Sequence, residues 1–228
     1  MTVAGMSADA LSELFDAHAV DVAPRLLGCR LTVSTPEEDV TVRLTEVEAY
    51  GGEGEDPGSH AYRGMTPRSA SLFGPPRHVY VYRSYGIHFC MNLVSHAAGA
   101  GGVLLRAAEV LEGRGAAVSR RGGRDTGVKL LSGPGRLGQG LGADTTLDGA
   151  AVEIVQDPPQ PRVGPQEGLR VVLAPPEQGH RPEPVSAGPR VGVSGEGGSE
   201  AYPWRFWLAE RRSVSPYRAS TRRRRAAP

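Results

Sequence analysis

The stretch His78–Asn92, HVYVYRSYGIHFCMN, predicts a β-hairpin. Its first half alternates valine and tyrosine over residues 79–82, and a second run of β-prone residues begins at Ile87. The short connection between the two runs contains Gly86, which can adopt the positive φ that tight hairpin turns require. The pattern therefore places Tyr85 at or beside the tip of the hairpin.

A tyrosine at such a tip has no neighbour in its own chain to contact, whereas turn tips favour small polar residues. A gap in a stack of nucleic-acid bases could receive the ring of Tyr85. Alternatively, the ring folds back and lies half-buried on a neighbouring strand. Both readings remain open, and the hairpin alone favours the second.

The composition is typical of a soluble globular protein, with 39% hydrophobic residues in a chain of 228 that can bury a sizeable core. We expect no membrane span, because no run of about 18 apolar residues occurs. The N-terminus lacks the basic-then-apolar pattern of a secretion signal, so we expect a cytoplasmic protein. Two cysteines, Cys29 and Cys90, are too few for a disulfide framework or a cysteine metal cluster.

The net charge is +1, but the charged residues are unevenly distributed along the chain. Acids gather at residues 37–56, whereas arginines gather at residues 106–136 and near the C-terminus, so the protein can present one basic face. The only lysine is Lys129. A mechanism that needs a lysine amine therefore has a single candidate besides the N-terminus.

Residues 40–50 predict a strand with an unusual side-chain pattern. One parity of this strand contains Val40, Val42, Leu44, Glu46, Glu48 and Tyr50. If the strand is regular, two carboxylates and a tyrosine lie on its buried side. Buried carboxylates are costly unless they are paired, so they usually line a cleft. The alternative is a β-bulge that turns them toward solvent.

Arginine and small residues mark two further candidate sites. Arg106 ends the apolar run VLLR, so it either reaches the surface or meets a buried carboxylate. Residues 130–141 predict a loop that enters a helix, with Ser132 as its cap and Pro134 in its first turn. A helix N-terminus of this kind can bind an anion, which makes Ser132, Gly133 and Arg136 candidates for contact with an anion.

The remaining pattern predicts one domain at residues 1–215, followed by a basic tail at 216–228 that we expect to be disordered. Helices are expected at 8–18 and 21–27, and strands at 29–33, 152–155, 170–173, 190–193 and 202–208. Residues 113–129 are expected to be a mobile connection and residues 178–189 a loop. The long loop after Tyr50 carries His60 and Arg63, and loops of that length are usually functional.

Several segments together resemble the alkyladenine (3-methyladenine) DNA glycosylase family, from about Leu26 to Leu208. They are TEVEAY, the loop histidine, YVYRSYGIHFCMN, GVLLR, LSGPGRL, RVGV and PWRFW, in this order. The resemblance implies an α+β fold, a single mixed domain around a curved antiparallel β-sheet from which the hairpin protrudes into the DNA minor groove. His88 departs from the pattern, because an aromatic or apolar residue is expected at its position.

The resemblance implies a base-excision repair enzyme. A monofunctional, nucleoid-associated glycosylase would flip a damaged purine (3-methyladenine, 7-methylguanine or hypoxanthine) out of double-stranded DNA and hydrolyse its N-glycosidic bond, as a monomer without metal or cofactor. At the matching positions, Glu48 would activate the water. Arg106 and the backbone carbonyl of Val191 would hold that water. Ser132, Gly133 and Arg136 would contact the DNA backbone.

The same resemblance implies how the flipped base is bound. Tyr50 and Tyr82 would enclose the base together with His60, and Asn92 would crowd the 2-amino group of guanine. Tyr85 would fill the vacated stack, which offsets part of the few kcal/mol that extrusion of a base costs. A cationic alkylated purine stacks favourably on electron-rich aromatic faces.

Two other functions remain possible from the sequence. A sugar hydrolase could use Glu46 and Glu48 as its two carboxylates, but the tip tyrosine and the arginine cluster would then have no role. A non-enzymatic nucleic-acid-binding module could carry the same carboxylates as structural groups.

Overall fold

The computed structural model describes residues 6–160, 168–179 and 183–220, so the end of the predicted tail, 221–228, lies outside it. The strands are β1 (Arg30–Ser34), β2 (Asp39–Tyr50), β3 (Val79–Ser84), β4 (His88–Val94), β5 (Gly102–Glu112), β6 (Val152–Ile154), β7 (Arg170–Ala174), β8 (Val185–Gly188) and β9 (Arg205–Leu208). The α-helices are α1 (Ala8–Leu14), α2 (Ala19–Leu26), α3 (Arg114–Arg120) and α4 (Pro134–Leu141). Short 3-10 helices are η1 (Ala70–Phe73), η2 (Gly127–Lys129), η3 (Thr145–Leu147) and η4 (Glu196–Gly198). None of the described helices is long and apolar enough to cross a membrane.

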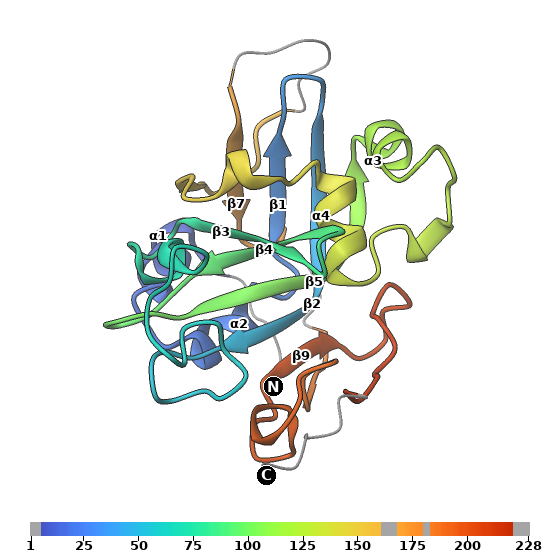
Figure 1. The fold of residues 1–228 in the computed structure, drawn as a ribbon. Coiled ribbons are helices and arrows are strands. Elements are labelled where there is room, and N and C mark those ends of the chain that lie inside the picture. Colours follow the sequence, from blue (N-terminus) through green and yellow to red (C-terminus); the bar gives the residue numbers. More distant parts are fainter. Residues whose placement is uncertain (1–5, 161–167, 180–182, 221–228) are drawn as a thin grey trace.

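The described strands form one curled sheet in the order β3-β4-β5-β2-β1-β7-β6, and β8 and β9 attach to it through β2 (Figure 1). The pairs are antiparallel except β6 with β7, which makes the sheet mixed. The hydrophobic core includes side chains from α1, α2 and α4 as well as from the sheet. The predicted α+β domain around a curved sheet with a hairpin is confirmed.

Two predictions about the connecting segments are wrong. Residues 113–129 are not simply a connection, because they contain α3, which buries Ala116 and Ala117. The described part of 178–189 contains β8, which pairs with β9, whereas residues 190–193 are not a strand. In each case the local composition suggested the wrong element, because contacts with residues distant in the sequence determine which secondary structure forms.

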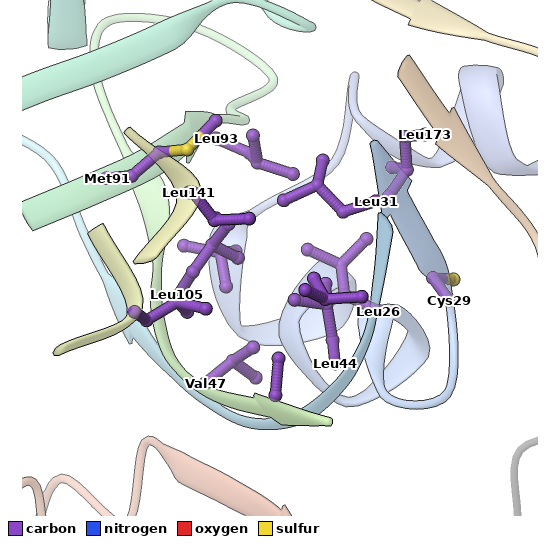
Figure 2. Packing of buried hydrophobic residues seen from close by; sticks show 14 of the residues in the cluster. Leu26, Cys29, Leu31, Leu44, Val47, Met91, Leu93, Leu105, Leu141 and Leu173 are labelled. Atoms are coloured by element: carbon purple, nitrogen blue, oxygen red, sulfur yellow. The ribbon is translucent and has the colours of Figure 1, made fainter. Parts of the chain in front are cut away.

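A β-bulge near Glu46 turns β2 over halfway along its length. The pairing of β2 with β5 shifts on either side of this residue, between Leu44 and Glu46 and again between Glu46 and Val47. Leu44 and Val47 therefore point into the same core, although a regular strand would place them on opposite faces (Figure 2). The expectation that Glu46 and Glu48 share a face with the preceding apolar residues is wrong.

The alternative expectation, that a bulge turns the two carboxylates toward solvent, is also wrong. Glu46 and Glu48 each have 0% exposure. The strand β9 pairs with the edge of β2 opposite Glu46, Val47 and Glu48. Arginine and serine groups contact the Glu46 carboxylate on the face to which the bulge turns it. The second half of β2 therefore has two buried sides, one apolar and one carrying acids.

Strands β3 and β4 form the predicted hairpin, with Ser84 opposite His88 at its end. The turn has positive φ at both Tyr85 (50°) and Gly86 (70°), and the Ile87 N–H donates to the Ser84 carbonyl at 3.0 Å. Tyr85 is 85% exposed, so the alternative of a ring folded back on a strand is wrong. A non-glycine residue in this left-handed region costs on the order of 1–2 kcal/mol, so the Tyr85 side chain is held at the tip at an energetic cost.

Helix α4 lies so close to β4 that two of its positions require glycine. A Cβ atom at Gly138 would lie 2.2 Å from the carbonyl oxygen of Phe89, and a Cβ atom at Gly135 would lie 2.8 Å from Cγ of His88. His88, the departure from the family pattern, thus lies against the helix. This contact joins the tip end of the hairpin to α4.

We expect Gly138→Ala to lower the free energy of unfolding by about 1–3 kcal/mol, because the added methyl group must push α4 away from β4. Urea denaturation measures the change. The control is Gly115→Ala in α3, where the methyl group would meet nothing within 4 Å. That variant should gain roughly 0.5–1 kcal/mol from helix propensity. Equal effects of the two changes would contradict the close approach.

Candidate active site

Glu48 is the centre of the site, because three donors converge on its buried carboxylate. Its Oε1 accepts from the backbone N–H of Val191 at 2.6 Å. Its Oε2 accepts from the Tyr50 hydroxyl at 2.9 Å and from Nη1 of Arg106 at 3.0 Å. A carboxylate offers about four acceptor positions, so one position on Oε1 stays available for a further donor.

A second carboxylate, Glu46, fixes the arginine of this group. Its Oε1 accepts from Nε of Arg106 at 2.9 Å, from Nε of Arg205 at 2.8 Å and from the Ser215 hydroxyl at 2.8 Å. Its Oε2 accepts from the Ser215 N–H at 2.7 Å. Burial would raise the pKa of Glu46, but the charges of Arg106 and Arg205 and the Ser215 N–H outweigh burial and lower it. Both oxygens of Glu46 are thus occupied, and nothing favours the sugar-hydrolase hypothesis.

A cavity of about 610 Å³ opens beside this group. Among the residues that line it are Tyr50, His60, Tyr82, Tyr85, Asn92, Arg106 and Val191. The sequence predicted a site role for each of these residues, and the fold brings them together from distant parts of the chain. Glu48 does not line the cavity itself but lies behind Tyr50, Arg106 and Val191, which are its hydrogen-bond donors.

The cavity lining also contains a histidine in contact with two tyrosines. Nδ1 of His60 lies 2.9 Å from the Tyr80 hydroxyl, and its ring centre lies 4.6 Å from that of Tyr82. Burial, and then the charge of Arg68, lower the pKa of His60, so the ring is neutral near pH 7. Burial raises the pKa of Tyr80 to about 12. The site role of Tyr80 was missed, although it shares the strand parity of Tyr82.

A buried ion pair joins the two loops that frame the cavity. Arg190 and Asp56 are both fully buried, and their side chains form two hydrogen bonds of 2.5 and 2.6 Å. Arg190 also donates to the carbonyls of Ala49 and Gly197, and its guanidinium lies 4.5 Å from the ring centre of Tyr50. Because Arg190 precedes Val191, this pair fixes the peptide that donates to Glu48.

Sequence reasoning missed the Asp56–Arg190 pair. The available signal was position alone, since Asp56 precedes His60 by four residues and Arg190 precedes Val191. Position in the sequence does not indicate that two loops meet. The two residues meet only because the fold brings their loops together.

The predicted DNA-backbone site lies at the start of α4. The helix begins after Gly133 without a side-chain cap, so the prediction that Ser132 caps it is wrong. Ser132 is buried, and its N–H instead donates to the Lys129 carbonyl at 3.3 Å. Arg136 is exposed, and Pro134 lines the cavity. Contacts of Ser132, Gly133 and Arg136 with a DNA backbone therefore stay a prediction.

Comparison with known proteins matches residues 13–212 of the chain to the model of one family, described as methylpurine-DNA glycosylase (MPG). A protein of Streptomyces avermitilis named "Putative 3-methyladenine DNA glycosylase" is 48% identical over 214 residues, which cover 93% of each chain. Proteins of the same name are 44% identical in Leifsonia xyli, covering 90% of this chain and 91% of the relative, and 42% identical in Rhodococcus jostii, covering 93% and 87%.

These similarities extend over most of the chain, and the family match includes all residues that line the cavity. The protein is therefore a DNA glycosylase, an enzyme of base-excision repair. Within that class, the chain belongs to the methylpurine-DNA glycosylase family.

Proposed function

We propose that this glycosylase removes alkylated and deaminated purines, of the 3-methyladenine, 7-methylguanine and hypoxanthine type, from double-stranded DNA, as a monomer. A water molecule activated by Glu48 cleaves the N-glycosidic bond. The observation that carries this proposal is the Glu48 carboxylate, which Val191, Tyr50 and Arg106 hold directly behind the wall of an aromatic cavity.

The cavity supports binding of a flipped purine. Tyr50 and Tyr82 supply aromatic faces for stacking, and the neutral His60 supplies a ring nitrogen for hydrogen bonding. Asn92 lines the same cavity, with its amide nitrogen donating to the Tyr80 carbonyl at 3.0 Å. This bond fixes the orientation of the amide, so Asn92 can crowd the 2-amino group of a guanine base without closing the cavity to 7-methylguanine.

The hydrogen bonds of Glu48 support water activation. The free acceptor position on Oε1 can receive a proton of the attacking water, with the Val191 carbonyl as a second acceptor. The water oxygen bonds to C1′ of the sugar as the glycosidic bond breaks. The electron pair of that bond leaves with the base, and Glu48 takes the proton.

The single lysine supports direct hydrolysis. Nζ of Lys129 donates to the Val214 carbonyl at 2.8 Å, and Lys129 is not among the residues that line the cavity. No described lysine is therefore placed to form a Schiff base with the sugar. We expect an abasic site as product, without strand cleavage.

The test is incubation of the wild-type protein with duplexes that contain a single 7-methylguanine or hypoxanthine, and with methylated DNA for 3-methyladenine. Chromatography should detect the free base, and strand breaks should form only after alkali treatment. Strand cleavage before alkali, or release of none of these bases, would contradict the proposed function.

We expect Tyr85→Asn to slow excision of a well-paired lesion, because the ring that would fill the vacated stack is lost. Asparagine tolerates the left-handed backbone at this position, so the free energy of unfolding should stay equal or rise slightly. Single-turnover excision and urea denaturation measure the two quantities. Tyr85→Phe, which keeps the ring, is the control and should excise normally. An unchanged rate in Tyr85→Asn would remove Tyr85 from the flipping step.

A further inference from the structure

The charged side chains at the cavity form ion pairs with side chains of opposite charge, except for Arg68 in the described part of the chain. Three guanidinium groups, those of Arg106, Arg205 and Arg190, form ion pairs with three carboxylates, those of Glu46, Glu48 and Asp56. Arg68 also lines the cavity, and in the described part of the chain no ion pair joins it to a carboxylate. With His60 neutral, the cavity has a surplus of one positive charge, located at Arg68.

The position of Arg68 is defined by two contacts with the hairpin. Its Nη2 donates to the backbone carbonyl of Arg83 at 3.0 Å, and its guanidinium lies 5.5 Å from the ring centre of Tyr82. Arg68 is exposed to solvent in the free protein. A base and its DNA would displace much of that water, which strengthens every charge interaction in the cavity.

We propose that Arg68 is a specificity-determining residue that favours neutral modified purines over cationic ones. This inference rests on the proposed function, because it concerns which bases the same cavity accepts. Purines methylated at N7 or N3 in DNA carry a positive charge, whereas hypoxanthine is neutral.

Two effects of the Arg68 charge would favour excision of neutral bases over cationic ones. Its charge repels a cationic base and occupies part of the negative potential of the Tyr82 ring, which such a base would otherwise use for stacking. A neutral base, in contrast, gains negative charge as it leaves with the electron pair of the glycosidic bond. A guanidinium beside it stabilises that charge.

The experiment compares Arg68→Gln with the wild-type protein. Second-order rate constants for excision of 7-methylguanine and of hypoxanthine are measured under single-turnover conditions with subsaturating enzyme, in duplexes of the same sequence. The ratio of the 7-methylguanine constant to the hypoxanthine constant should rise by about three- to tenfold, as expected for removing one like charge at several ångströms in a medium of intermediate dielectric.

Two control variants separate this role from general attraction to DNA. Arg68→Lys keeps the charge, and its ratio should stay within about twofold of the wild-type ratio. Arg83→Gln removes an equal charge from the hairpin that Arg68 contacts, but Arg83 lies over Phe89 and does not line the cavity, so its ratio should not change. Any loss of rate in Arg83→Gln should affect both lesions equally.

An unchanged ratio in Arg68→Gln would overturn the inference, as would an equal change in Arg83→Gln. A uniform loss for both lesions in Arg68→Gln would make Arg68 a contact to the DNA backbone instead. These outcomes leave the proposed function intact. That function fails separately, if the wild-type protein releases neither base.

Discussion

Glu48→Gln should abolish release of 3-methyladenine from methylated DNA, while binding to DNA with an abasic site survives. Glutamine has nearly the same shape but cannot take a proton from water, so the rate should fall by at least about 10²–10⁴-fold. Single-turnover release of the base and a fluorescence binding assay with abasic-site DNA measure the two properties.

The matched control is Glu53→Gln, which removes an equal charge from an exposed position in the loop after β2. Its rate should equal that of the wild-type protein. Thermal unfolding of both variants checks their folding, because the amide introduced by Glu48→Gln would add a donor where three donors already converge. Excision at the normal rate by a folded Glu48→Gln variant would assign water activation to another group.

Asp56→Asn should lower the free energy of unfolding by about 3–5 kcal/mol, because it leaves the Arg190 guanidinium buried without a carboxylate. Excision should also slow, since the displaced Arg190 no longer fixes the Val191 N–H on Glu48. Urea denaturation and single-turnover kinetics measure the two effects.

A surface pair of the same geometry provides the control. Arg114 and Asp125 also form two hydrogen bonds, of 2.7 and 2.8 Å, but both side chains are nearly half exposed. Asp125→Asn should cost less than about 1 kcal/mol. The double variant Asp56→Asn, Arg190→Gln should lose less stability than the two single variants together. Strict additivity would mean that the buried pair does not act as a unit.

The sequence was sufficient for the hairpin and for the residues that meet in the cavity. Alternating valine and tyrosine, with Gly86 in the turn, predicted both strands and the tip position of Tyr85. The resemblance to the family predicted that Glu48, Arg106 and Val191 lie together, and the fold places Glu48 in contact with the other two.

The sequence was insufficient wherever a long-range contact decides the local structure. Strand parity predicted one face for Leu44, Glu46 and Glu48, because periodicity does not reveal the extra residue of a bulge. The Asp56–Arg190 pair spans 134 residues, and no local pattern indicates it. Composition also failed for β8, which exists because β9 lies beside it.

The hydrogen bonds of the two central glutamates have a consequence for the newly made protein. Glu48 accepts a hydrogen bond from Val191, which is synthesised 143 residues later, and Glu46 accepts one from Ser215, which is synthesised 169 residues later. During translation, the sheet strands up to β5 can pair long before these partners leave the ribosome. The hydrogen bonds of the two glutamates therefore cannot all form until Val191 and Ser215 have left the ribosome.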